Sequence, residues 1–323
     1  MAERTYKNEF PIEEIDDNSW ITGQVLISRH ASKPDGPCWD DGKDAFFTIS
    51  EAPNPKPSTR PLSESCPIVE LSCGPTTARA GIFEVGHAYL TIDLNIGTPE
   101  HVTLGKLAEM DLSFKVPKVY YHGVHCDRYY LVCSSFPSGR NLLYAWTETD
   151  DHDTRSLWVS QIADACLELS KFRGSAITAI DGGILNDHLL LKEVGSAGDI
   201  DYEPEKMREN CLEIGLDCSE LTFAFNSIQP IAFTVNNDGL VGISSWRHAG
   251  FVPKDWIGTK VRSNDLLESA DVCNKLWTEE DLAHWSYYIG VAMKENGFRE
   301  FWYDFAKWNS NKAQRHMKRI GKA

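Results

Sequence analysis

The chain has 323 residues, of which 42% are hydrophobic and 24% are charged, and its formal net charge is -15. This length and composition are ordinary for a globular protein of two lobes, and the negative charge argues against general binding to nucleic acid or anionic membranes. The sequence lacks the roughly 18 uncharged apolar residues of a membrane span and the apolar core of a signal peptide, so we expect a cytoplasmic protein.

Residues 1–64 are rich in proline, and few of their apolar residues recur with a regular period. Of the seven prolines, six stand at positions 34, 37, 53, 55, 57 and 61. Because proline interrupts both helices and strand ladders, this part predicts an irregular N-terminal extension with one short strand near residues 21–27.

Residues 65–137 contain short extended runs, at 68–72, 81–85, 89–94, 118–121 and 129–133. Runs of this length separated by turn residues predict antiparallel strands. The segment from His122 to Asp127 joins the last two runs and holds two His, one Cys and one Asp. A metal site is one interpretation of it, but a polar hairpin is favoured because a metal needs a full ligand set converging in space.

The cysteines are nine in number and scattered, with no CxxC pair. An odd and dispersed set predicts neither a disulfide framework nor a zinc ribbon. We therefore expect buried, free thiols.

Residues 138–323 carry helical patterns. Asp153 or Thr154 can cap a helix whose apolar residues recur at spacings of three and four up to Leu169. Thr278 stands three residues before Asp281, the spacing of a capping box, and predicts a second helix. The last 18 residues are basic, which indicates either a solvated helix or a docking surface.

Between these helices, residues 223–253 are extended. Two apolar runs, 231–235 and 240–244, flank Asn236-Asn237-Asp238-Gly239, which predicts a tight hairpin because these residue types tolerate positive φ. This segment resembles the core of fungal proteins of the aminoglycoside/choline phosphotransferase-like family, whose pattern reads HGDLHPxN, a hairpin, then DWExAGxxP. The matching positions are Pro230, Asp238-Gly239, Gly242-Ile243, Trp246, Ala249-Gly250 and Pro253.

Two further segments support the resemblance, which covers roughly residues 66–320. Residues 116–120, VPKVY, are similar to the family's VPRVY, and the segment from Gly174 to Leu191 is similar to its GSxDGGPxxDxR. The resemblance implies an α+β, two-lobed protein-kinase-like fold, with a small antiparallel β N-lobe at 65–137 and a mainly helical C-lobe at 138–323. Asp181 and Asp187 of the second motif would either cap turns or act in catalysis, and turn capping is favoured.

The residues that would perform phosphoryl transfer in this family are replaced. Ser227 stands at the catalytic Asp, Ala232 at the metal-binding Asn and Ser245 at the metal-binding Asp. In the N-lobe, Ile92 takes the place of the phosphate-binding Lys, and Thr103 lies near the position of its Glu partner. Because magnesium requires hard oxygen ligands and phosphates require cations, we expect no ordinary kinase activity, no bound metal and no cofactor.

The resemblance implies an interlobe cleft whose neutral and aromatic walls suit an organic ligand better than a triphosphate. The candidate substrate-binding residues are Gln229, Ser245, Trp246, Asp93 and Ser135. The candidate catalytic residues are His248, Arg247 and Ser227, with His248 or Arg247 as a proton or hydrogen-bond donor. The alternative for the Arg-His pair is that it faces solvent or braces the lobe.

Three hypotheses about function follow. The first is an enzyme of fungal secondary metabolism that orients an organic small molecule for a metal-free cyclisation, isomerisation or related rearrangement. The second is a non-catalytic pseudokinase that binds a ligand or a protein partner. The third is an atypical phosphotransferase that uses displaced residues such as Lys106 and Asp93.

Overall fold

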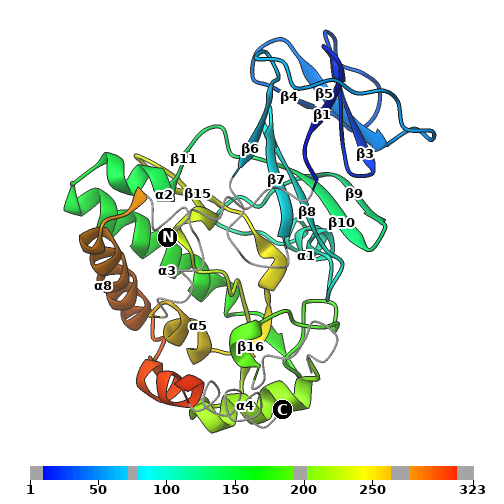
Figure 1. Ribbon diagram of the computed structural model, residues 1–323. Coiled ribbons are helices and arrows are strands. Elements are labelled where there is room, and N and C mark those ends of the chain that lie inside the picture. The colour runs from blue at the N-terminus through cyan, green and yellow to red at the C-terminus, as the bar shows by residue number, and fades with distance from the viewer. Residues whose placement is uncertain (1–9, 72–78, 192–201, 263–275, 311–323) are drawn as a thin grey trace, which may run out of the picture. The chain divides into compact units, whose positions relative to one another are not determined.

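The computed structural model describes residues 10–71, 79–191, 202–262 and 276–310. The chain divides into two compact units (Figure 1). Unit 1 comprises Met1–Asn95, Pro117–Pro137 and Ser269–Val272, and unit 2 comprises Ile96–Val116, Ser138–Glu268 and Cys273–Ala323. The predicted α+β class is confirmed, because unit 1 is built from antiparallel sheets and unit 2 is mainly helical.

The first sheet of unit 1 lies where the sequence predicted an irregular extension. Its strands are β1 (Glu13–Asp16), β2 (Ser19–Thr22), β3 (Val25–His30), β4 (Trp39–Asp40) and β5 (Phe46–Glu51), in the antiparallel order β1-β2-β3-β5-β4. The prolines all lie outside these strands, at 11 before β1, at 34 and 37 between β3 and β4, and from 53 onward after β5. The prolines therefore lie outside the strands, and their number led to the wrong prediction of an irregular segment.

The second sheet of unit 1 follows the predicted runs. It contains β6 (Ile68–Leu71), β7 (Arg79–Val85), β8 (Ala88–Leu94), β9 (Val119–His125) and β10 (Arg128–Ser134), in the antiparallel order β6-β7-β8-β10-β9. Cys126 and Asp127 join β9 to β10 with φ angles of 48° and 61°, so the polar hairpin is confirmed. The described ranges contain no group of three His, Cys, Asp or Glu residues that could hold a metal ion.

The two sheets of unit 1 share one hydrophobic core. It is made of the buried residues Ile12, Trp20, Val25, Ile27, Trp39, Phe47, Ile68, Phe83, Val85, Ala88, Leu90, Ile92, Tyr130 and Val132. The indole Nε1 of Trp39 also donates a hydrogen bond of 2.6 Å to the carbonyl of Val85, which links β4 of the first sheet to β7 of the second. Ile92 therefore has a packing role, since an apolar side chain stabilises this core where a lysine would not.

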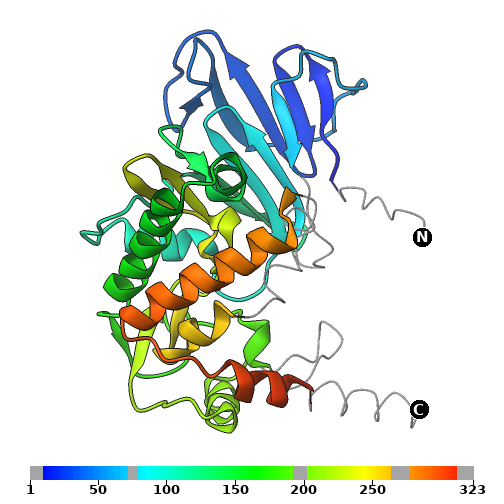
Figure 2. The same ribbon diagram turned by 90° about the vertical axis from the view of Figure 1, so that its left-hand side faces the viewer.

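Among the described residues, unit 2 contains six named helices, and residues 302–310 are also helical. The helices are α1 (Glu100–Leu107), α2 (Leu142–Ala145), α3 (His152–Leu169), α4 (Pro204–Ile214), α5 (Asp255–Lys260) and α8 (Glu279–Glu295). Helices α3 and α8 pack side by side (Figure 2). Within the described ranges, no helix has the length and apolar character needed to cross a membrane.

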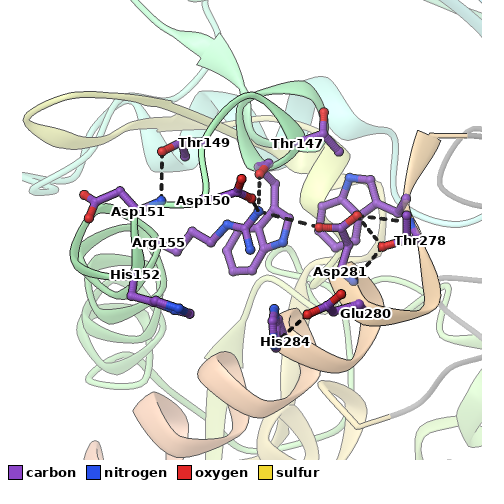
Figure 3. Close-up of polar contacts among 12 residues, drawn as sticks. Thr147, Thr149, Asp150, Asp151, His152, Arg155, Thr278, Glu280, Asp281 and His284 are labelled. Carbon is purple, nitrogen blue, oxygen red and sulfur yellow. Dashed lines mark hydrogen bonds and ion pairs between the residues drawn. The ribbon is translucent and has the colours of Figure 1, made fainter.

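The N-termini of α3 and α8 are both capped by side chains, and Figure 3 shows the cap of α8. Thr278 and Asp281 form the predicted capping box at α8. At α3 the cap is Asp151, which accepts the Thr154 N–H, so the helix begins slightly before the expected Asp153 or Thr154. Arg155 lies between the two helix ends, where its guanidinium contacts the face of the Trp146 ring at 4.8 Å.

Two small sheets of unit 2 position the central segment. One contains β11 (Arg140–Asn141), β14 (Phe233–Asn236) and β15 (Gly239–Ile243), and the other contains β12 (Arg173–Gly174), β13 (Leu221–Ala224) and β16 (Gly250–Pro253). Strands β14 and β15 are the predicted hairpin, and Gly239 at its turn has a φ of 121° that L side chains rarely adopt.

The basic tail falls largely outside the described residues.

Candidate functional site

Two loops leave the same end of the β13–β16 strand pair in unit 2. Ala224 pairs with Gly250 at that end, so the loop of residues 225–229 and the loop of residues 244–249 start side by side. The rings of Phe225 and Trp246 hold the two loops together, with centroids 4.8 Å apart. Further along, the Ser244 N–H donates to the Ala232 carbonyl at 2.8 Å. We call these two segments the loop pair.

Each loop contains a non-glycine residue in the left-handed region. Asn226 has a φ of 62° and Ser245 a φ of 66°. Such residues are uncommon, and asparagine tolerates the conformation better than most residue types. Asn226 directly precedes Ser227, so the left-handed residue of the first loop stands beside a candidate catalytic residue.

Asn226 is also the least satisfied polar group of the loop pair. Its side chain is 1% exposed, and neither Oδ1 nor Nδ2 has a hydrogen-bond partner among the described residues. A buried polar group without a partner costs about 1–3 kcal/mol, and asparagine presents both a donor and an acceptor. Sequence reasoning missed this residue, because an Asn beside a strand end ordinarily indicates only a turn.

The positions of the family's carboxylates hold neutral groups. Ser227 is 8% exposed and its carbonyl accepts the Gln229 N–H at 2.7 Å, while Ser245 and Gln229 are half-buried. A carboxylate reaches this loop from elsewhere in the chain, since Oε1 of Glu100 in α1 accepts the Trp246 N–H at 2.7 Å. Glu100 lies one helical turn before Thr103, the residue that the sequence had aligned with the family's Glu.

Trp246 is a core residue of unit 2. It is fully buried, its Nε1 donates to the Ile243 carbonyl at 2.8 Å, and its ring stacks on Phe114 with centroids 6.2 Å apart. Trp246 therefore packs in the core of unit 2, and its contact with a substrate stays a prediction.

His248 is a neutral imidazole near neutral pH. Burial lowers its pKa from 6.5 to about 3, and the nearby Arg247 guanidinium contributes to the same shift. Its Nδ1 bonds to the backbone carbonyl of Asn186, which can only accept, so the Nδ1–H is the donor and Nε2 is the acceptor nitrogen. The role of His248 as a proton or hydrogen-bond donor stays a prediction, and its Nδ1–H is already donated to the Asn186 carbonyl in this structure.

Beside His248 lies a buried ion pair. The Nζ of Lys260, which is 3% exposed, is 2.9 Å from Oδ2 of Asp187, which is 1% exposed, and the Trp256 Nε1 donates to the same oxygen at 2.8 Å. Burial opposes ionisation, but the Lys260 ammonium and the Trp256 N–H outweigh it and lower the pKa of Asp187.

The turn-capping role predicted for both aspartates is confirmed. Asp187 accepts the Leu189 N–H at 3.2 Å, and Asp181 accepts the Gly183 N–H at 2.9 Å.

The remaining predicted site residues lie in unit 1. Asp93 is 3% exposed on β8, and the Ser135 N–H donates to the His87 carbonyl at 2.9 Å. The predicted site residues of unit 2 all lie in the loop pair. They are Ser227, Gln229, Ser245, Trp246, Arg247 and His248. Lys106, the displaced lysine considered above, is exposed on α1.

Comparisons with known proteins give similarity only at the level of structure. No protein-family model matches the sequence, and no curated protein matches it. The solved structures that are similar include the ADP-bound aminoglycoside phosphotransferase APH(2'')-Ib, at 13% identity over 71% of this chain and 80% of that chain, with a TM-score of 0.42.

A GDP complex of wild-type aminoglycoside 2'-phosphotransferase-IIIa is similar at 13% identity, over 77% of this chain and 93% of that chain, with a TM-score of 0.42. A thermostable mutant of aminoglycoside phosphotransferase APH(4)-Ia, in a ternary complex with AMP-PNP and hygromycin B, is similar at 13% identity over 76% and 93% of the two chains, also with a TM-score of 0.42.

Proposed function

We propose that the loop pair of unit 2 binds an organic small molecule and does not support magnesium-dependent phosphoryl transfer. The observation that carries this proposal is the Asn226 side chain, which is buried with both its donor and its acceptor unpaired among the described residues. A ligand bearing a carboxamide or lactam would satisfy both atoms at once, because such a group also has one donor edge and one acceptor edge. Binding involves a displacement of residues 225–229, since the amide is covered by protein.

Neutral groups in the loop pair and at the adjoining Ala232 argue against phosphoryl transfer. Ser227, Ala232 and Ser245 supply no negative charge for magnesium, and Glu100 already accepts the Trp246 N–H. Loss of one preorganised electrostatic group typically costs about 3–4 kcal/mol of transition-state stabilisation, and here several groups are replaced together.

A second candidate is the metal-free rearrangement of the bound molecule, as in fungal secondary metabolism. It is favoured by His248, whose neutral form and tautomer are fixed by burial and by the Asn186 carbonyl, beside the cationic Arg247. A fixed acceptor next to a cation can orient a polar substrate, and positioning alone can contribute several kcal/mol. The runner-up is a cytoplasmic pseudokinase that binds a ligand or protein partner without converting it.

The binding proposal is tested with Asn226→Gly, which keeps the left-handed backbone and removes only the amide. A set of small lactams and carboxamides is screened against the wild-type chain by thermal shift and calorimetry. We expect at least one to raise the melting temperature of the wild type, and Asn226→Gly to weaken its binding about tenfold or more. Equal affinity in both proteins would remove Asn226 from the site.

Magnesium-ATP serves as the opposing probe. At millimolar concentration it should leave the melting temperature unchanged, because a ligand that does not bind the folded state cannot stabilise it. A saturable shift that disappears with EDTA would overturn the proposal.

The rearrangement candidate is tested separately with His248→Ala and Arg247→Ala. Turnover of an organic intermediate, followed by mass spectrometry, should fall on the order of a hundredfold in either variant if these side chains orient the substrate. Wild-type binding without any product would favour the pseudokinase.

A further inference from the structure

We propose that His152 and His284 together bind one divalent transition-metal ion, such as Zn²⁺, at the N-terminal ends of α3 and α8. His152 is the first residue of α3, and His284 lies in the second turn of α8. Their imidazole rings have centroids 6.2 Å apart and planes inclined by 70°. Figure 3 shows the His152 ring extending from α3 toward His284. The pair lies within unit 2 and outside the loop pair.

The separation of the two rings suits a shared metal ion. Zinc–nitrogen bonds are about 2.0–2.1 Å long, so the centroids of two imidazoles on one ion lie roughly 5–6.5 Å apart, depending on the angle between the bonds. The observed 6.2 Å falls in this range. His152 is exposed and the His284 side chain is 36% exposed, so an ion can reach both rings from solvent. Rotation of the two side chains is enough to bring their nitrogens onto it.

A hydrogen bond already orients His152. Its Nδ1 is bonded to the hydroxyl of Tyr288, which lies one turn after His284 on α8. When the Nδ1–H donates to this hydroxyl, Nε2 keeps its lone pair for a metal ion. Metal-binding histidines ordinarily make such a bond from their second nitrogen, which fixes the ring. The Tyr288 ring also contacts both imidazoles, with centroids 6.1 Å from His152 and 6.3 Å from His284.

The charges at these two helix ends favour a cation. Arg155 is the buried cation between them, and its Nη2 lies 3.5 Å from an oxygen of Asp150 and 3.6 Å from one of Asp281. Oε1 of Glu280 lies 3.9 Å from the His284 Nε2. A surplus of carboxylates attracts divalent cations and opposes anions. Further carboxylates at the two ends are Asp151, Asp153 and Glu279.

The ligand set selects the kind of ion. Imidazole suits Zn²⁺, Ni²⁺ and Cu²⁺, whereas Mg²⁺ and Ca²⁺ prefer oxygen ligands. Within the part of the chain that the structure describes, no three His, Cys, Asp or Glu residues are grouped to hold a metal. The protein therefore supplies two nitrogen ligands, and water completes the coordination.

A bound ion has a mechanical consequence for unit 2. Its two ligands come from α3 and α8, which pack against each other. An ion held by both histidines cross-links the first turns of these helices. Because the cross-link exists only in the folded state, the metal stabilises that state by mass action.

The test titrates the full chain, without a polyhistidine tag, with ZnCl₂, NiCl₂ or MgCl₂ by calorimetry and thermal melting. We expect Zn²⁺ and Ni²⁺ to bind and to raise the melting temperature. Mg²⁺ should bind about a hundredfold more weakly or not at all, because imidazole is a poor ligand for it. Electron paramagnetic resonance of bound Cu²⁺ should show two imidazole nitrogens on the ion.

Substitutions locate the ion. His152→Gln and His284→Gln should each weaken Zn²⁺ binding about a hundredfold, since either change leaves a single nitrogen ligand. Tyr288→Phe keeps the ring and removes the hydroxyl that orients His152, so it should weaken binding about tenfold. His125→Gln in unit 1 is the matched control and should bind Zn²⁺ like the wild type. His125 is also bonded to a tyrosine hydroxyl, that of Tyr121, at 2.9 Å.

Melting curves without metal show whether each variant is folded. The proposal is overturned if Zn²⁺ does not bind the wild-type chain, or if the wild type and both histidine variants bind it equally well. If a histidine variant does not fold, the Cu²⁺ spectrum of the wild type decides, and fewer than two nitrogens overturn the proposal. The titration uses no organic ligand, so its outcome is independent of the function proposed for the loop pair.

Discussion

Each unit contains a buried carboxylate, and the two differ in what holds their charge. Glu14 of unit 1 is fully buried, but its partner Arg60 has a side chain that is 49% exposed. Asp187 of unit 2 is paired with Lys260, and both side chains are at most 3% exposed. Water can therefore reach the cation of the first pair and not that of the second. A buried ion pair sealed from water is far more sensitive to the loss of one partner.

The Glu14 pair also differs in what it connects. Arg60 donates to Glu14 Oε1 from Nε at 2.9 Å and from Nη2 at 2.6 Å, and the Ser63 N–H donates to Oε2 at 2.9 Å. The backbones of Glu14 and Arg60 also bond to each other. Glu14 thus attaches the proline-rich segment that follows β5 to strand β1, whereas Asp187 fixes a turn within the core of unit 2.

The largest effect is expected for Lys260→Met. It leaves the Asp187 carboxylate buried without a cation, which typically costs about 3–5 kcal/mol. Unfolding in urea, followed by tryptophan fluorescence, should show this loss because Trp256 contacts the same carboxylate.

The matched control is the double variant Asp187→Asn with Lys260→Met, in which neither charge remains. The side-chain oxygen of the introduced asparagine would still accept a hydrogen bond from Trp256, so most of the lost stability should return. If the double variant is no more stable than Lys260→Met, the destabilisation comes from packing and not from an uncompensated charge.

A second effect concerns His248 and acid. Its pKa is lowered in the folded state from 6.5 to about 3, so between these values the unfolded chain binds more protons than the folded chain. Stability should therefore fall as the pH decreases from 6.5 to 3. His248→Gln, which cannot gain this proton, should lose less stability over the same window in thermal melts. Parallel curves for the two proteins would show that His248 is not held neutral.

The two regions also differ in how far the sequence determines them. The hairpin of β14 and β15 and the capping box of α8 follow from local chemistry, a turn rich in Asn, Asp and Gly and a Thr three residues before an Asp. The sheet of β1 to β5 depends on long-range pairing and on a core shared with the second sheet. Its strands have two to six residues, too short for periodicity to identify them.

The candidate site shows the same limit. The spacing of Ser227 and Ser245 around a hairpin placed them correctly on neighbouring loops. It could not show that Trp246 is buried, that Asn226 lacks a partner among the described residues, or that Asn186, 62 residues before His248, fixes its tautomer. Burial and pairing of this kind depend on the tertiary fold, which a local motif does not encode.

A smaller effect is expected for Glu14→Gln, with a different pH window. Hydrogen bonding from the Ser63 N–H, aided by Arg60, lowers the pKa of Glu14 from 4.5 to about 2. The stabilisation is therefore complete above 4.5 and is lost as the pH falls from 4.5 to 2. The melting temperatures of wild type and Glu14→Gln should differ at pH 6 and converge toward pH 2. A difference that persists at pH 2 would assign the effect of Glu14 to packing.

The smallest effect is expected at an exposed helix end of unit 2, where the Thr278 hydroxyl is paired with Asp281. Thr278→Ala removes the hydroxyl that accepts the Asp281 N–H at 3.1 Å and donates to Asp281 Oδ2 at 2.7 Å, and loss of such a cap typically costs about 0.5–2 kcal/mol. Thr147→Ala is the matched control (Figure 3). Thr147 is an exposed threonine near the same helix end, and its hydroxyl donates to the Tyr144 carbonyl and does not cap α8. Backbone amide hydrogen exchange should accelerate in the first turn of α8 in Thr278→Ala and not in Thr147→Ala, because only the first variant loses the cap. The loss of stability should stay small, because water can replace the lost hydrogen bonds at an exposed helix end. Thr278→Ala could instead destabilise unit 2 as much as Lys260→Met does. Loss of a partner at an exposed helix end would then be as damaging as loss of a partner in a buried ion pair. That result would contradict the contrast between sites that water can reach and sites that it cannot.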